Sequence, residues 1–433
     1  MSSSAGIHAR QAERAPHLPR HSSVVASLAV VATWFATTAA HAGGYDTPML
    51  YSARHMGMGG AAVGYVRDPS ALFHNPAGLA HVHRAAVLGD FSLLLGKLHA
   101  SPSRIARNVD SELTVAPFFL VGGAFRITDF MVGGLGLYPV ASSGGTYLYG
   151  DGFEDTTTLL FLEGSPALAF NLSHDVRLGV GYRVTFVQLE RYQGPAERGG
   201  AATTDLTLAG HSYGGVRIGA QWTPIPVLQL GISYRHVTET QVETEGGTAL
   251  ALQARDVSTR FTLPSKLIFG ARWDATDRVG VASDLEYNFN SQNEGDPLQG
   301  VRADNGDRLS VPNVFEWTNS ITLRVGGEYR VLQQTDRHVA LRAGYVFDGK
   351  TANEKYPTAF GTPPAPTHVF TGGGGYRSGG FEVNLAYAYR HGSTEISAET
   401  LSAPDVKACR FCGDAGEYSI SLHGIYADVS FEL

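Results

Sequence analysis

Residues 57–62 and three nearby histidines have the types and spacing that could support chemistry. Residues 57–62 read Gly-x-Gly-x-x-Ala, the spacing of a dinucleotide-binding loop, but no hydrophobic strand precedes them as that loop requires. His74, His81 and His83 could bind a metal ion, although solvated or hydrogen-bonded histidines are the commoner arrangement. The sequence has neither a G-x-S-x-G nor an H-E-x-x-H motif. We therefore predict no cofactor, no metal and no enzyme, although distant strands could still assemble catalytic groups.

The beginning of the chain has the pattern of an export signal. Three arginines lie before an apolar stretch at 24–40, which is followed by the small-x-small sequence Ala40-His41-Ala42. Basic residues, an apolar run and small residues at a cleavage position are typical of a signal peptide. We predict that residues 1–42 are removed on export, the alternative being a membrane anchor of similar length.

Cys409 and Cys412 are the only cysteines of the chain, and they form a C-x-x-C pair. In the oxidising compartment outside the cytoplasm, such a pair is expected to form a local disulfide. A free pair of thiols or a shared metal is the alternative. A redox catalyst would need a thioredoxin-like fold around the pair, which the sequence does not indicate.

Composition and charge restrict the class of protein further. Without residues 1–42 the chain carries 30 basic and 39 acidic residues, a formal charge of −9, which argues against a nucleic-acid partner. The chain has 52 glycines, 10% aromatic and only 17% charged residues. After residue 42 no apolar run reaches the ~18 residues that a membrane-spanning helix needs. If the protein crosses a membrane, it crosses as strands.

Many segments alternate between apolar and polar residues, as half-buried strands do. Clear examples are 279–290, 321–331 and 381–390. The pattern predicts fourteen strands, at 84–96, 112–127, 130–140, 157–172, 176–190, 204–222, 227–242, 257–273, 277–291, 315–331, 337–348, 366–378, 381–391 and 418–433.

The connections between these strands alternate between long and short along the whole chain. An even number of long strands, with short turns at one end and long loops at the other, is typical of a transmembrane β-barrel. A soluble sandwich or propeller would have shorter strands and no reason to sort its loops by side. The sequence therefore predicts an all-β fold, a 14-stranded antiparallel transmembrane β-barrel in the outer membrane of a Gram-negative cell.

In such a barrel the apolar residues face lipid and the polar residues face the lumen. Several arginines fall on lumen-facing positions together with Asp284, Glu286, Glu328 and Glu382. We expect most of these charges to pair with one another. A minority could contact the head group of a ligand, because arginine suits bidentate contact with a carboxylate. The candidates for that contact are Arg183, Arg217 and Arg342.

The stretch YSARHMGMGGAAVGYVRDPSALFHNPAGLA at 51–80 resembles the N-terminal segment of the FadL/TodX family of outer-membrane transporters. Asn75, Pro76 and Ala77 match the Asn-Pro-Ala motif of that family, and the stretches 116–140, 164–184 and 262–273 are also similar to it. The resemblance implies that residues 43–83 form a hatch inside the lumen and that residues 84–433 form the barrel.

The resemblance also implies a function, namely passive uptake of hydrophobic molecules such as long-chain fatty acids or aromatic hydrocarbons. The ligand would pass from the extracellular loops to a pocket beside the hatch and leave sideways, where the third strand kinks inward. In this sequence Gly133, Gly134, Gly136 and Pro139 suit such a kink, with ordinary small-residue packing as the alternative. Outer-membrane lipids and the hydrophobic ligand are the expected partners, and the protein is expected to be a monomer.

A second role remains open at this stage. Some distant relatives in the family resemble membrane scaffolds for a secretion or surface-attachment system. A continuous apolar path from the loops into the lumen would favour transport, and a filled lumen with a conspicuous loop or turn interface would favour the scaffold.

Overall fold

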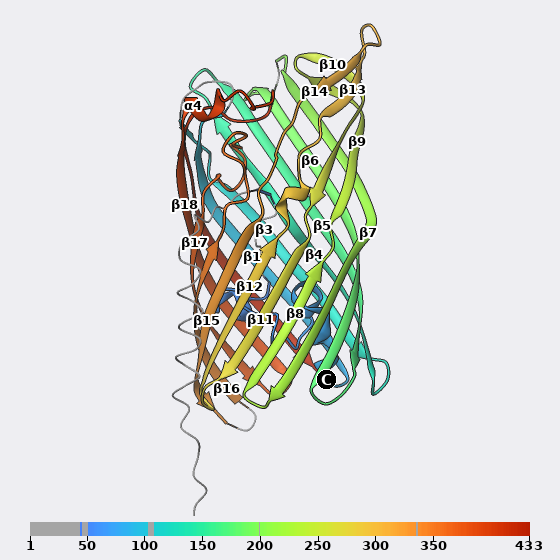
Figure 1. The fold of residues 1–433 in the computed structure, drawn as a ribbon, viewed down its shortest axis with the longest axis vertical. Helices are drawn as coiled ribbons and strands as arrows, with labels where there is room; N and C mark the ends of the chain where they lie inside the picture. The colour runs from blue at the N-terminus through green and yellow to red at the C-terminus, as the bar shows by residue number, and fades with distance from the viewer. Residues whose placement is uncertain (1–43, 46–50, 103–107, 199, 335–336) are drawn as a thin grey trace, which may run out of the picture. The chain divides into compact units, whose positions relative to one another are not determined.

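The computed structural model describes residues 44–45, 51–102, 108–198, 200–334 and 337–433. The predicted signal peptide lies outside these residues. Within them, nineteen strands form one antiparallel sheet that closes on itself (Figure 1). Closure is made by β1 (Ala85–Ala100), which pairs with the last strand, β19 (Gly416–Glu432), on one side and with β3 (Thr114–Arg126) on the other.

The remaining strands follow one another around the sheet. They are β2 (Val109–Asp110), β4 (Met131–Leu148), β5 (Phe153–Asn171), β6 (Val176–Pro195), β7 (Thr204–Ile225), β8 (Leu228–Arg235), β9 (Thr238–Ala249), β10 (Leu252–Leu263), β11 (Lys266–Asp274), β12 (Val279–Asn288), β13 (Leu298–Arg302), β14 (Arg308–Val311), β15 (Ser320–Gln333), β16 (Arg337–Asp348), β17 (Thr367–Ser378) and β18 (Phe381–Ile396).

These strands make fourteen crossings, so the predicted fold is confirmed. β8 and β9 both pair with β7 and form one interrupted crossing, and β10 and β11 form the next. β2 likewise continues into β3. β13 and β14 form a hairpin within the connection between β12 and β15.

Two of the predicted long connections are wrong. Residues 141–156 are mostly strand, because β4 and β5 are joined only by Tyr149–Gly152. Residues 243–256 are also mostly strand, and β9 turns into β10 at Leu250 and Ala251. The outer part of β9 carries Glu243 and Glu245 on its exposed face, and the outer part of β4 has serines and glycines at 142–145, so both lack the apolar positions by which we recognised strands.

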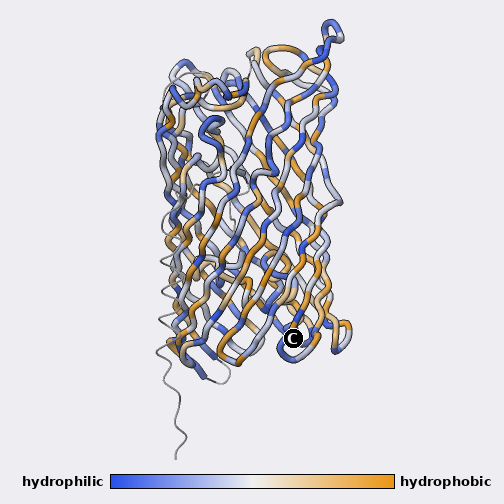
Figure 2. Tube along the Cα trace, viewed as in Figure 1, coloured by the Kyte–Doolittle hydropathy of each residue, from blue (hydrophilic) through white to orange (hydrophobic). Residues whose placement is uncertain are grey.

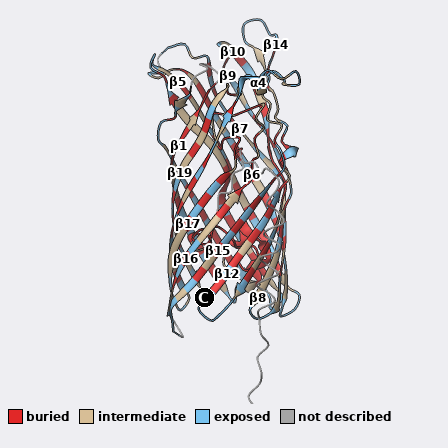
Figure 3. Ribbon diagram, turned by 60° about the vertical axis from the view of Figure 1, so that its left-hand side comes forward, coloured by how far each residue is buried: buried red, intermediate tan, exposed pale blue. Residues whose placement is uncertain are grey.

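The two faces of the sheet differ as a membrane barrel requires. On β12, Asp284 and Glu286 are 2% and 3% exposed, whereas Leu285 between them is 40% exposed. Figures 2 and 3 show this alternation of hydropathy and of burial along many strands. No helix in the described part of the chain is long and apolar enough to span a membrane.

Residues 51–82, which we call the N-terminal segment, lie inside the barrel and appear in blue in Figure 1. The segment contains three short helices, α2 (Ala53–Met56), α3 (Ala71–His74) and the 3-10 helix η1 (Pro76–His81). Most of its residues are buried, although the helices are too short to be stable alone. The lumen wall must therefore hold this segment in place.

Candidate functional site

Two lumen carboxylates hold the start of the N-terminal segment. Asp90 of β1 accepts a hydrogen bond from the backbone N–H of Ala53 at 3.1 Å, and Asp428 of β19 accepts one from that of Arg54 at 3.0 Å. The two aspartates are register partners on neighbouring strands. The side chain of Ser52 does not cap helix α2, so the barrel wall supplies acceptors for its free N–H groups.

A third carboxylate holds the middle of the segment. Asp284 of β12 accepts hydrogen bonds from the backbone N–H groups of Ala62 and Val63, at 2.9 and 3.1 Å. Charge-assisted hydrogen bonds of this kind are stronger than neutral ones. The alternation of β12 predicted that Asp284 faces the lumen, but it carries no sign of the contact with the segment.

Three cross-strand pairs of glycines let the backbone of the N-terminal segment approach the wall. A Cβ atom on Gly219 would lie 1.9 Å from Asn75 Oδ1, and one on Gly326 would lie 2.2 Å from the carbonyl oxygen of Met58. Any larger residue would push the segment off the wall. The pairs are Gly179 with Gly219, Gly231 with Gly270, and Gly326 with Gly344.

The Asn75-Pro76-Ala77 motif rests on the first of these glycine pairs. Asn75 is fully buried and donates from Nδ2 to the carbonyl oxygens of Val63 at 2.8 Å and Ala220 at 3.0 Å. Its Oδ1 accepts from the backbone N–H of Ala77 at 3.2 Å and so caps η1. One side chain thus joins two parts of the segment to strand β7.

The three arginines predicted as head-group contacts are buried and ion-paired. Arg183 Nε lies 2.7 Å from Glu163 Oε2, Arg217 lies 3.6 Å from the same carboxylate, and Arg342 Nε lies 2.9 Å from Glu328 Oε2. Their pairing follows the pattern expected for most lumen charges. None of the three lines either of the two cavities described below, and contact with a ligand head group stays a prediction.

The third crossing, β4, loses its ladder with β3 beyond Leu137 while it stays paired with β5 as far as Leu148. β3 and β4 pair only from Val121 to Arg126, opposite Val132–Leu137, and within the described residues no ladder continues beyond that point. The register of β4 against β5 shifts between Pro139 and Ala141. Residues 138–141 are all buried, which breaks the alternation of the strand. We call residues 114–120 of β3 and 138–145 of β4 the unpaired β3–β4 edge.

The predicted kink glycines have a different place. Gly133, Gly134 and Gly136 lie in the regularly paired part of β4. A Cβ atom on Gly134 or Gly136 would lie 2.9 Å from Leu79 or Leu72 of the N-terminal segment, respectively. These two glycines therefore make room for that segment, and the irregularity itself lies at Pro139.

An aromatic cavity of about 110 Å³ lies near the end of the barrel that carries the long connections. Tyr45 forms part of its wall, with its ring centroid 4.6 Å from that of Trp317 and 5.9 Å from that of Phe261. Among the residues that the structure describes, Arg191 is the only charged one that lines it. Its apolar and aromatic lining is Tyr45, Leu159, Leu189, Leu206, Phe261, Leu298, Phe315, Trp317, Tyr356, Phe360 and Phe411.

A second cavity, of about 140 Å³, lies between the N-terminal segment and strands β1, β18 and β19. Its lining is polar and charged, and includes Arg54, Asp68, Glu382, Asp428 and Glu432. Such a lining suits water rather than an apolar ligand, because an unpaired charge is costly to bury against an apolar group.

The three histidines of the sequence analysis have separate partners. His74 Nε2 contacts the carbonyl oxygen of Tyr51, and His81 Nε2 lies 3.1 Å from Gln221 Oε1. His83 lies 3.0 Å from Glu432. Burial, helped by the nearby positive charges of Arg177 and Arg67, lowers the pKa of His81 to about 3. The ring of His81 is therefore uncharged at neutral pH.

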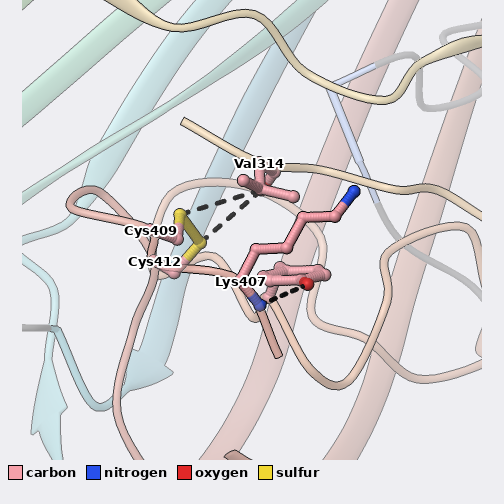
Figure 4. The surroundings of a disulfide bond; sticks show 5 residues. Val314, Lys407, Cys409 and Cys412 are labelled. Carbon is pink, nitrogen blue, oxygen red and sulfur yellow. Dashed lines mark hydrogen bonds between the residues drawn. A yellow bond between two sulfur atoms is a disulfide. The ribbon is translucent and has the colours of Figure 1, made fainter. Parts of the chain in front are cut away.

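Residues 57–62 were considered as a dinucleotide-binding loop, and the two cysteines as a disulfide. Residues 57–62 form turns packed against the barrel wall rather than the start of a helix after a strand. Cys409 and Cys412 are joined by a disulfide in the connection between β18 and β19 (Figure 4).

The family model described as outer membrane protein transport protein (OMPP1/FadL/TodX) matches residues 33–414. Solved structures that resemble the fold include a FadL homologue of Pseudomonas aeruginosa, at 17% identity and a TM-score of 0.69, over 90% of this chain and 99% of that one.

Two toluene transporters have the same fold. TodX of P. putida has 15% identity and a TM-score of 0.65, over 90% of this chain and 99% of that one. TbuX of Ralstonia pickettii has 16% identity and a TM-score of 0.61, over 89% and 98%. A comparison with curated proteins gives no significant match.

Proposed function

Because the chain belongs to the OMPP1/FadL/TodX family of outer membrane transport proteins, we propose that it takes up hydrophobic compounds passively through the outer membrane. The observation that carries the proposal is the aromatic cavity. It lies next to the long connections, where a molecule from outside the cell would arrive, and eleven of its lining residues are apolar or aromatic. Ligand sites are typically concave and mostly apolar in this way.

The size of the cavity favours a small ligand. Its volume of about 110 Å³ is close to that of the ~150 Å³ apolar cavity that binds benzene in an engineered protein. It is well below the range of about 300–1,000 Å³ of pockets for larger ligands. The preferred ligand is a compound with a single aromatic ring, and a fatty-acid chain would have to extend beyond the cavity.

The route out of the cavity passes the N-terminal segment and ends at the unpaired β3–β4 edge. At this edge the ladder between neighbouring strands is interrupted, so a ligand meets no paired backbone on its way to lipid. Release straight into water would expose about 200 Å² of apolar surface, at a cost of about 5 kcal/mol. Lateral release into the membrane avoids that cost.

The aromatic cavity and the transport family favour uptake over a scaffold role for a secretion or surface-attachment system. A scaffold needs no aromatic cavity inside the barrel. Asp90 and Asp284 hold the N-terminal segment through hydrogen bonds from its backbone. These hydrogen bonds can break and form again without unfolding of the barrel, which suits a segment that must move during transport.

The proposal is tested by measuring toluene binding to the purified protein and toluene uptake by cells that depend on it. Trp317→Ala removes a wall of the cavity and is expected to weaken binding and slow uptake. Trp273→Ala is the matched control, because Trp273 is 37% exposed on the outside of β11. If the wild-type protein bound neither toluene nor a fatty acid, uptake would be the wrong function.

A further inference from the structure

The disulfide between Cys409 and Cys412 lies in a short turn that is fixed to a neighbouring connection. Both sulfur atoms lie near the carbonyl oxygen of Val314, at 3.8 and 3.5 Å (Figure 4). Between the cysteines, the backbone N–H of Arg410 donates to the carbonyl oxygen of Pro312 at 3.0 Å. The turn is thereby attached to the connection between β12 and β15.

The other side of the turn is attached to the connection between β16 and β17. The backbone N–H of Gly413 donates to the carbonyl oxygen of Pro357 at 2.7 Å. The backbone N–H of Lys407 donates to the hydroxyl of Tyr356 at 2.9 Å (Figure 4). The disulfide turn therefore joins the two connections that supply Phe315, Tyr356 and other residues of the aromatic cavity.

Phe411 lies between the two cysteines and lines that cavity. The guanidinium carbon of Arg191 lies 5.7 Å from the centre of the Phe411 ring and 4.7 Å from that of Phe360. Arg191 also forms an ion pair with Asp155 of β5, so its position is set by the barrel wall. Phe411 and Phe360 thus share one fixed cation, which is a favourable aromatic contact.

We propose that Phe411 is a specificity-determining residue of the aromatic cavity and that the Cys409–Cys412 disulfide positions its ring against the ligand. The inference rests on the proposed uptake of hydrophobic compounds. A bridge across only two residues leaves the backbone of the turn few conformations, so the ring of Phe411 stays at the wall. A cavity bounded in this way selects flat single-ring compounds, and its enlargement admits longer chains.

A double-mutant cycle on ligand binding tests the proposal, with the affinity for toluene measured in four purified proteins. They are the wild type, Phe411→Ala, the cysteine variant Cys409→Ser/Cys412→Ser, and the triple variant that combines all three substitutions. Loss of one aromatic contact corresponds to about two- to tenfold weaker binding. Phe411→Ala and the cysteine variant are each expected to lose that much. The triple variant is expected to bind no more weakly than Phe411→Ala, because the disulfide acts through Phe411.

The ratio of oleate to toluene affinity supplies a second readout that a general loss of stability would not change. Phe411→Ala is expected to raise this ratio, and Phe411→Leu, which keeps an apolar side chain, is expected to raise it less. Phe289→Ala serves as the matched control, since Phe289 is a half-buried aromatic of an adjacent connection that does not line the cavity. If the cysteine variant fails to fold, reduction of the folded wild-type and Phe411→Ala proteins replaces it in the cycle, and the Phe411 variants still decide whether Phe411 sets the ratio.

Additive losses in the cycle, or an unchanged ratio in Phe411→Ala, would overturn this inference and leave the proposed uptake intact. Absence of toluene and oleate binding in the wild type would instead overturn the proposed uptake itself. The two failures are therefore distinguishable in one set of measurements.

Discussion

The hydroxyl of Tyr51 donates a hydrogen bond to the carbonyl oxygen of Pro139 at 2.8 Å. Tyr51 begins the N-terminal segment, and Pro139 lies where β4 leaves its ladder with β3. A carbonyl that has lost its strand partner is costly to bury, so the tyrosine hydroxyl stabilises the irregular strand. The same hydrogen bond couples the position of the segment to the unpaired β3–β4 edge.

The first prediction is that Tyr51→Phe loosens the N-terminal segment and the unpaired β3–β4 edge together. The change leaves the carbonyl oxygen of Pro139 without this donor, at a cost of about 1–3 kcal/mol. Hydrogen–deuterium exchange is expected to speed up in the N-terminal segment and in residues 138–145, while the rest of the barrel stays protected. Phe73→Leu is a control, because it alters the ring packed on Tyr51 and keeps the hydroxyl. Unchanged exchange at both places in Tyr51→Phe would show that the two are not coupled.

The second prediction concerns the glycine pair beneath Asn75. Gly219→Ala places a Cβ atom 1.9 Å from Asn75 Oδ1, so the Asn75-Pro76-Ala77 turn must move away from β7. Overpacking of this kind costs about 1–3 kcal/mol. We expect Gly219→Ala to expose the N-terminal segment to exchange as Asn75→Ala does, and both variants to reduce toluene uptake while the barrel still assembles.

Gly164→Ala provides the control for that experiment, because a Cβ atom there meets nothing within 4 Å. If Gly219→Ala and Gly164→Ala gave the same exchange and the same uptake, the close approach of the segment to the wall would not contribute to the stability of its docked position.

The barrel was predictable because strand alternation is a local property of the sequence. The pattern at 279–290 or 381–390 needs no knowledge of the partner strand. The resemblance to the FadL/TodX family also identified Asn75 before its contacts were known. Arg342 and Glu328 were also placed in the lumen from the sequence, where such charges were expected to pair with one another, and these two do.

The contacts of the N-terminal segment could not be predicted in this way. Gly179 and Gly219 are far apart in sequence and become neighbours only when the register of β6 against β7 is known. Asp90 and Asp428 lie at opposite ends of the chain and meet only when the barrel closes. The aromatic cavity escaped prediction for the same reason, because Tyr45, Phe261 and Phe411 come from three separate parts of the chain.

The third prediction is a pH dependence of the docked N-terminal segment. Burial and nearby positive charges lower the pKa of His81 to about 3, whereas an exposed histidine has a pKa of ~6.5. Between these values the released segment binds a proton that the docked segment does not bind. Docking is therefore fully favoured above pH ~6.5 and weakens as the pH falls, by at most about 2 kcal/mol at pH 5.

His81→Gln tests this prediction, because glutamine can still hydrogen bond with Gln221 but does not titrate in this range. Exchange of residues 76–82, corrected for the intrinsic pH dependence of exchange, is expected to rise from pH 7 to pH 5 in the wild type. The rise is expected to be smaller in the variant. Burial lowers the pKa of His74 as well, so part of the effect remains. Equal protection of the wild type at both pH values would contradict the prediction.

The last prediction concerns the unpaired β3–β4 edge as the exit. The kink was expected at Gly133, Gly134, Gly136 and Pro139, and the ladder with β3 is interrupted beyond Val121 and Leu137, so substitutions must be made beyond that point. Ala116 of β3 lies on the unpaired edge, half-buried and facing the lumen.

Ala116→Trp fills this edge with an indole ring and is expected to slow toluene uptake about tenfold, which corresponds to about 1.4 kcal/mol on the barrier. Toluene binding is expected to stay at the wild-type level, because Ala116 does not line the aromatic cavity. Ala116→Ser leaves the edge open and should transport normally. Slow uptake together with wild-type binding in Ala116→Trp is expected only if the ligand passes the edge after it has left the cavity. Wild-type uptake by a well-folded Ala116→Trp protein would place the exit elsewhere in the wall.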